Sequence, residues 1–167
     1  MPQIVDVEPL TRDRFREFGD VIEIDGDASY PINGGMADRF HDMAKVEASG
    51  PEGRVLISMV RSRHCELPLV VSAVERHPYG SQAFIPTKLG SFLVVVCLDR
   101  QGVPQAPRAF IAQPGQGVNY HSNVWHGVLS PLVNEQDFLV VDRGGLGSNL
   151  EEYNFAEPYV IEGNVRC

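Results

Sequence analysis

The sequence has few cysteines and no cluster of them. Cys65, Cys97 and Cys167 are the three cysteines of the 167 residues, and no pair has CxxC spacing. This excludes a disulfide-rich framework and a zinc ribbon. Cys97 follows an apolar run, so we expect a packed thiol there that behaves as a small hydrophobic side chain.

Long hydrophobic runs and positive charge are also missing. No stretch of about 18 apolar residues occurs, and the first residues do not pair a basic region with an apolar one. We therefore expect a cytoplasmic protein without a membrane partner. Lys and Arg number 14 against 22 Asp and Glu, a net charge of −8 at pH 7. Because such a charge repels phosphate backbones and anionic lipids, we expect no nucleic-acid partner.

What is present indicates an all-β fold. Hydrophobic residues make up 43% and charged residues 22%, values that exclude a disordered chain and a coiled coil. Glycines and prolines separate short apolar runs, which we interpret as strands. The expected strands are residues 55–61, 67–77, 81–88, 91–100, 108–113, 117–129 and 137–143. They predict a sandwich, jelly roll or barrel in one domain, residues 1–167.

Two details refine this prediction. Residues 92–96 are apolar on both faces, so their strand should be central. Helix is expected only at residues 11–18, where Thr11 is a suitable N-cap and Phe15 and Phe18 share a face, and over residues 36–48. Less than about a quarter of the chain should then be helical.

Polar residues converge in the segment 74–84. Glu75 and His77 are two apart and share one face of a strand. Residues 78–81 have turn composition, and a hairpin there would bring Gln82 opposite His77. We therefore expect Glu75, His77 and Gln82 to lie close together.

Two cations end apolar strand faces nearby. Arg61 follows the apolar face of residues 55–61, and Lys88 lies on the same face as Gln82. Each is a candidate for binding an anion at the mouth of a cavity. Alternatively, each marks the point where its strand reaches solvent.

A second group of candidates is His121 and His126. A turn at residues 122–123 would separate them, so that both imidazoles, or only one, lie near a pocket. The alternative for each of them is a hydrogen-bonded core histidine.

The pattern Glu75-x-His77-x4-Gln82, followed about 44 residues later by His126, resembles the two motifs of the cupin superfamily. Those motifs hold a metal with His-x-His-x4-Glu and a later histidine. The resemblance implies a double-stranded β-helix, that is, a jelly-roll barrel, with His77, Gln82 and His126 as metal ligands. Imidazoles suit nickel, zinc or iron, whereas the amide oxygen of Gln82 is a weaker ligand than a carboxylate.

Longer strings resemble one family, the ureidoglycolate lyases. They run in order over residues 5–145 and comprise residues 32–35, 39–42, 75–86, 117–121, 124–126, 137–139 and 142–145. The resemblance implies a homodimeric cupin-like barrel that cleaves (S)-ureidoglycolate to glyoxylate and urea in allantoin and purine breakdown, with a divalent metal, nickel being the one named. It also implies these site residues: Glu75, His77, Gln82, His126, Arg61, Lys88 and His121.

The implied reaction takes a proton from a hydroxyl group and supplies one to the departing urea nitrogen. His77 and His126 are candidates for this proton transfer, with Glu75 orienting an imidazole or acting as the base. Arg61, with its two-pronged guanidinium, suits the substrate carboxylate slightly better than Lys88 does. A cupin oxygenase or isomerase, and a non-catalytic cupin that binds a small acid, are the alternative functions.

Overall fold

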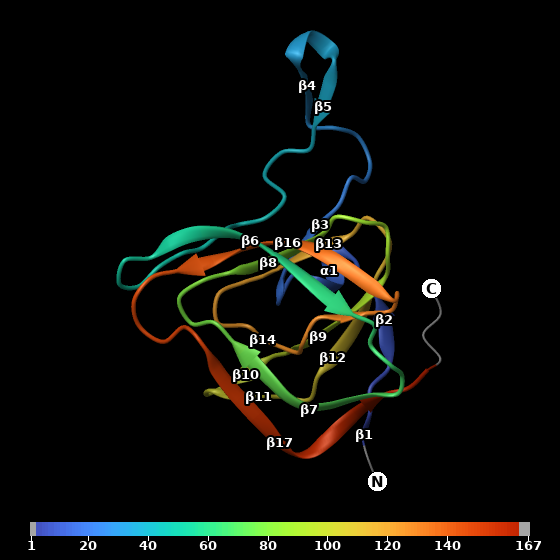
Figure 1. The fold of residues 1–167 in the computed structure, drawn as a ribbon, viewed down its shortest axis with the longest axis vertical. Coiled ribbons are helices and arrows are strands. Elements are labelled where there is room, and N and C mark those ends of the chain that lie inside the picture. The colour runs from blue at the N-terminus through green and yellow to red at the C-terminus, as the bar shows by residue number, and fades with distance from the viewer. Residues whose placement is uncertain (1–2, 164–167) are drawn as a thin grey trace.

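The computed structural model describes residues 3–163, so Cys167 and the two ends of the expected domain lie outside it. Two sheets face each other and form a curled, cupin-like β fold (Figure 1). None of the described helices is long and apolar enough to cross a lipid bilayer. Within residues 3–163, helix is confined to α1 (Arg12–Phe15) and the single 3-10 turn η1 (Asn33–Gly35), which confirms the low helical content expected.

The larger sheet has eight strands. In spatial order, they are β1 (Gln3–Ile4), β17 (Glu151–Ile161), β7 (Leu69–Arg76), β14 (Trp125–His126), β9 (Phe92–Cys97), β12 (Arg108–Ala112) and β2 (Val7–Pro9), with β15 (Ser130–Pro131) also paired to β9. β9 is buried along its whole length, as its apolar sequence predicts. Its two faces belong to two separate core clusters.

The smaller sheet has five strands. In order, they are β3 (Gly19–Ile22), β13 (Gly117–Tyr120), β8 (Gln82–Pro86), β16 (Glu135–Gly144) and β6 (Arg54–Arg63). The core between the sheets contains Phe92 from one sheet and Phe138 from the other, with ring centroids 5.2 Å apart. Phe15 and Phe18 close this core, and Thr11 caps α1 by accepting a hydrogen bond from Arg14 N, so the first predicted helix is confirmed in a shorter form.

Two short hairpins complete the fold, β10 (Asp99–Arg100) with β11 (Val103–Pro104), and β4 (Tyr30–Ile32) with β5 (Ala37–Arg39). The second is an arm that projects from the body (Figure 1). The expected helix over residues 36–48 is wrong, because its first residues form strand β5. Its last residues are also not helical, since Glu47 and Ser49 exchange backbone hydrogen bonds with the 79–81 segment.

The expected hairpin at residues 78–81 is also wrong. β7 pairs with β14 and β17 in the larger sheet, whereas β8 pairs with β13 and β16 in the smaller one. Residues 77–81 therefore cross from one sheet to the other. The predicted strand 117–129 is in fact two, β13 and β14, separated by the turn expected at residues 122–123.

Candidate active site

Facing side chains from the two sheets line a pocket of about 350 Å³, here called the site pocket. Its lining residues are Glu75, His77, Ser81, Gln82, Asp142, Arg143, Asn149 and Leu150. The crossover at residues 77–81 brings the end of β7 next to the start of β8, so Glu75, His77 and Gln82 converge as the sequence predicted. The route is a crossover instead of a hairpin.

The ring of His77 is held by a hydrogen bond from its Nδ1 atom. Nδ1 lies 2.7 Å from the backbone oxygen of Asn149, and because a carbonyl only accepts, Nδ1 carries the proton. The Nε2 atom therefore has a free lone pair, and it is buried without a partner. The ring is thus oriented to offer Nε2 to a ligand.

His126 is arranged in the same way. It is 2% exposed, its Nδ1 donates to the backbone oxygen of Gly127 at 3.2 Å, and its Nε2 is buried without a partner. Its ring stacks on Tyr120 with centroids 4.4 Å apart. Burial, together with the nearby His77, lowers the pKa of His126 to about 3. His126 is therefore a neutral imidazole at neutral pH. Its Nε2 is suited to accept a hydrogen bond or to coordinate a metal ion, and unsuited to supply a proton.

Glu75 completes the group. It is the cross-strand partner of His126 between β7 and β14, and Glu75 Oε1 lies 3.9 Å from His77 Nε2. One ligand atom from each of Glu75, His77 and His126 falls within 4.8 Å of the other two. Burial raises the pKa of Tyr120, and the charge of Glu75 acts in the same direction, so that hydroxyl stays protonated.

These three residues fit a divalent metal ion. Two imidazole nitrogens and one carboxylate are a common ligand set for first-row transition metals. The Nδ1–H groups bonded to backbone carbonyls are the outer contacts that fix metal-binding histidines. Two buried, unpartnered Nε2 atoms facing one carboxylate also need a partner, and a cation supplies it.

Gln82 faces this group from the smaller sheet. Its Oε1 is buried without a partner, and it lines the site pocket. That Gln82 is a metal ligand stays a prediction.

Arg61 and Lys88 are placed elsewhere. The Arg61 guanidinium makes two hydrogen bonds to the carboxylate of Asp137, at 2.7 and 3.1 Å, and Lys88 Nζ lies 3.2 Å from it. These two cations lower the pKa of Asp137 to about 2. Neither cation lines the site pocket, and both side chains are mostly exposed.

His121 also lies apart from the site pocket. Its Nε2 is 3.2 Å from Asp20 Oδ1, and the side chain is partly exposed. Of the two histidines in the 117–126 segment, only His126 therefore joins the group that could hold a metal ion.

Several residues of the site were not anticipated. Asp142 lies on the inward face of β16, which the alternation of that strand could have indicated. Arg143 donates to the backbone oxygens of Ser49, Pro51 and Leu146. Asn149 holds His77 from the loop before β17, and nothing in its local sequence signals that contact.

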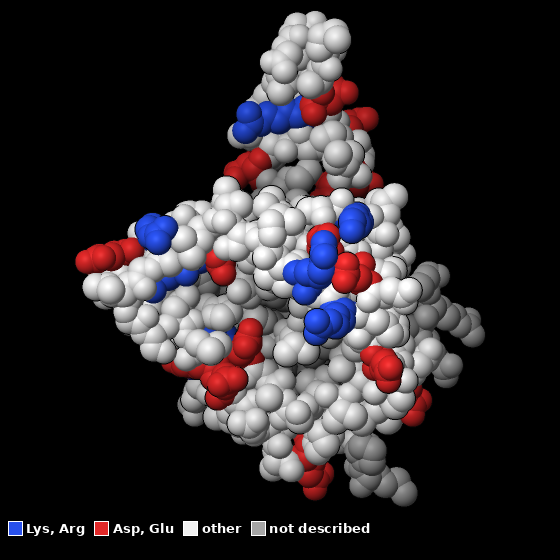
Figure 2. Space-filling model, viewed as in Figure 1, with Lys and Arg blue, Asp and Glu red and all other residues white. Residues whose placement is uncertain are grey.

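Charged side chains of both signs are mixed over the face shown in Figure 2, without a continuous basic surface. The site pocket follows the same pattern: Arg143 supplies its one cationic side chain among the described lining residues, beside Glu75 and Asp142. A small polar substrate with hydrogen-bond donors suits the two carboxylates of such a pocket.

Comparison with known proteins identifies the family. A sequence model described as "Ureidoglycolate lyase" matches residues 2–162. The chain belongs to the ureidoglycolate lyase family. It is 60% identical over 157 residues to the ureidoglycolate lyase of Mesorhizobium japonicum, covering 94% of this chain and 96% of the relative. It is 59% identical over 154 residues to that of Chelativorans sp., covering 92% and 93%.

A third relative, ureidoglycolate lyase 2 of Rhizobium meliloti, is 53% identical over 156 residues, covering 93% of this chain and 96% of the relative. Coverage of this extent includes both halves of the site pocket. The matched range, residues 2–162, contains the segments that carry Glu75, His77 and His126.

Proposed function

We infer that this chain is a ureidoglycolate lyase that splits ureidoglycolate into glyoxylate and urea, and that the reaction takes place in the site pocket. The location of the active site is supported by the convergence of Glu75, His77 and His126, with two buried imidazole nitrogens that lack a partner. Family membership supplies the reaction.

The chemistry needs one proton to move within the substrate. The hydroxyl oxygen loses a proton, its carbon forms the aldehyde of glyoxylate, the carbon–nitrogen bond breaks, and the nitrogen takes up a proton to give urea. No covalent intermediate with the protein is needed. A positioned acid–base group typically contributes 10²–10⁴-fold to such a step.

Glu75 is the proton carrier in this proposal. Its carboxylate has two oxygens, so one can face the imidazoles while the other accepts the hydroxyl proton and returns it to nitrogen. His126 is kept neutral by burial and does not hold the proton. His77 and His126 act through their Nε2 lone pairs.

Glu75, His77 and His126 would hold a divalent ion, and Gln82 would join them if its side chain turned toward it. We propose nickel, the metal that the family resemblance implies. When bound, such an ion lowers the pKa of the substrate hydroxyl and attracts the substrate carboxylate.

The proposed lyase acts as a homodimer. β6 is the outer strand of the smaller sheet, and its long unpaired edge is a surface that proteins normally cover. Ile57 and Met59 on this strand are 74% and 61% exposed. We propose that a second copy of the chain covers this face about a two-fold axis, which gives each copy the same contact.

The test of function is product release. Purified protein incubated with racemic ureidoglycolate should release urea and glyoxylate in equal amounts and stop when the (S) enantiomer is consumed. Stripping the metal with a chelator should abolish turnover, and added nickel should restore it. Binding without turnover would contradict the lyase function, and full activity in protein shown by elemental analysis to be metal-free would contradict the metal.

A further inference from the structure

Asp142 lies near the C-terminal end of strand β16. Phe138 and Val140 point into the core between the sheets, and Asp142 has the same parity. β16 is antiparallel to the neighbouring strand β8, and Val141 of β16 pairs with Ala83 of β8. One residue further along, Asp142 therefore lies beside Gln82. Both side chains line the site pocket from the smaller sheet.

Asp142 has an unsatisfied carboxylate oxygen. Its Oδ1 is buried without a hydrogen-bond partner. Of the six buried side-chain atoms without a partner in the described chain, four surround this site: the Nε2 atoms of His77 and His126, Gln82 Oε1 and Asp142 Oδ1. A buried acceptor without a donor costs free energy, so such atoms mark where a ligand donates.

The four atoms form two chemically distinct walls. The larger sheet presents two imidazole nitrogens and Glu75, the group suited to a cation. The smaller sheet presents two oxygens, which accept hydrogen bonds. Ureidoglycolate matches this asymmetry, because its carboxylate and hydroxyl are at one end and the N–H groups of its ureido unit are at the other.

We propose that Asp142 binds the ureido end of the substrate, with Oδ1 accepting its N–H groups; this assignment rests on the lyase function proposed above. A carboxylate cannot donate and repels the substrate carboxylate, so Asp142 also sets which end of the substrate faces the smaller sheet. It is a specificity residue: it favours compounds with a terminal amide nitrogen over those without one.

Two unreactive analogues test this role. N-carbamoylglycine keeps the carboxylate and the ureido unit, whereas N-acetylglycine replaces the terminal amino group by a methyl group of similar size. Binding of each to the full chain is measured by calorimetry. Wild-type protein should bind N-carbamoylglycine at least about tenfold more tightly than N-acetylglycine, which is the scale of a hydrogen bond to a charged group. The Asp142→Asn variant should reduce that preference to less than about threefold.

Asp13→Asn is the matched control, because Asp13 is an exposed carboxylate paired with Arg16 on the surface and should keep the full preference. Equal binding of the two analogues by wild-type protein overturns the proposal, even if Asp142→Asn fails to fold. An unchanged preference in folded Asp142→Asn also overturns it. Since neither analogue reacts, a chain that shows the preference but releases no urea contradicts the lyase function and not the role of Asp142.

Discussion

At the scale of single residues, each imidazole of the site is fixed by a backbone carbonyl. His77 and His126 both donate Nδ1–H, to Asn149 and Gly127, and both turn Nε2 toward Glu75. The ring orientations therefore depend on main-chain atoms and not on mobile side chains. His77, which follows β7, and His126, which lies on β14, therefore both leave Nε2 without a partner.

The position of Arg61 and Lys88 gives a prediction about the substrate carboxylate. Because both cations contact Asp137 and neither lines the site pocket, we expect Arg61→Ala and Lys88→Ala each to change KM less than about threefold. Steady-state kinetics with ureidoglycolate measure this. A KM raised tenfold or more in either variant would instead assign that cation to the substrate carboxylate, as the sequence suggested.

At the scale of the elements, the crossover between β7 and β8 is the critical connection. Gly80 forms a bridge with Ala48, and a Cβ atom at position 80 would collide with Arg143 Cβ on β16. The close approach of these segments therefore requires glycine. This close approach places Ser81 and Gln82 where they line the site pocket.

Gly80→Ala should consequently destabilise the protein by about 1–3 kcal/mol, the usual cost of an added methyl group in a packed site, and lower its activity. Thermal unfolding measures the loss. Gly163→Ala is the control, since its nearest neighbour would be 4.0 Å away. Equal melting temperatures for wild type and Gly80→Ala would show that the crossover tolerates a side chain.

The elements also show what the sequence could predict. The strong apolar runs of β6, β9, β12 and β16 were predictable, because strand periodicity is local. β17 was not predicted, because its alternation of Tyr153, Phe155, Tyr159 and Ile161 is interrupted at the register shift between Asn154 and Tyr159 and its place beside β7 depends on distant pairing. Local turn composition at residues 78–81 predicted a hairpin. Whether β7 and β8 pair with each other or enter different sheets depends instead on their pairing with distant strands.

The candidate site was predictable in part for the same reason. Glu75, His77, Gln82 and His126 belong to recognisable spacings, and the structure brings them to one place. Arg61 and Lys88 were selected by strand parity and by the family resemblance; parity predicts which face of the strand a residue lies on, but not whether that end of the strand reaches the pocket. The alternation of β16 could have indicated the inward face of Asp142, whereas the contact of Asn149 with His77 depends on where the loop before β17 lies in the fold.

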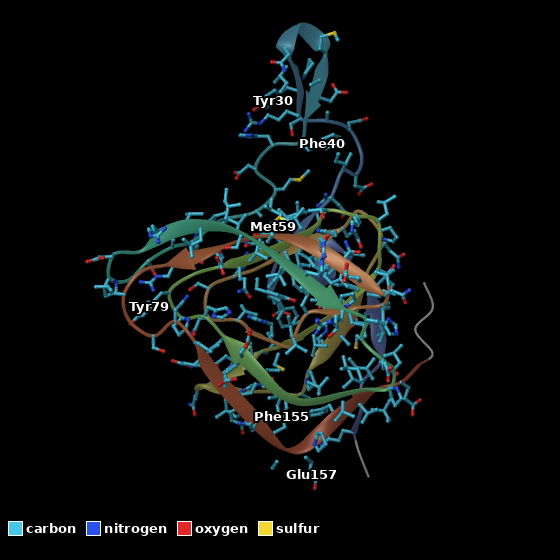
Figure 3. All side chains as sticks on the ribbon, viewed as in Figure 1. Tyr30, Phe40, Met59, Tyr79, Phe155 and Glu157 are labelled. Carbon is cyan, nitrogen blue, oxygen red and sulfur yellow. The ribbon has the colours of Figure 1, made fainter. Side chains whose placement is uncertain are left out.

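At the scale of the whole molecule, two features leave the body incompletely covered. The hairpin arm carries Tyr30 away from the body, and Met59 lies on the outer strand β6 (Figure 3). An isolated two-stranded hairpin is at best marginally stable in water, so a neighbouring molecule would stabilise it. Both features agree with the proposed dimer.

Ile57→Glu should therefore dissociate the dimer by placing a charge in an apolar contact. Sedimentation at micromolar concentration should give twice the 18.5 kDa chain mass for wild type and 18.5 kDa for the variant. Val103→Glu, at an exposed site on β11, should stay dimeric. A wild-type protein of 18.5 kDa, or a dimeric Ile57→Glu variant, would contradict the proposed interface.

In the proposed lyase, Glu75, His77 and His126 carry out the cleavage, and the turnover of histidine variants measures their part in it. His77→Ala and His126→Ala should each lower kcat by at least about a hundredfold while the protein stays folded. His64→Ala, which changes a histidine outside the site pocket, should keep wild-type turnover. If His77→Ala and His126→Ala instead retained most of their activity and only lost about 1–3 kcal/mol of stability, the two histidines would be structural and the cleavage would take place without them.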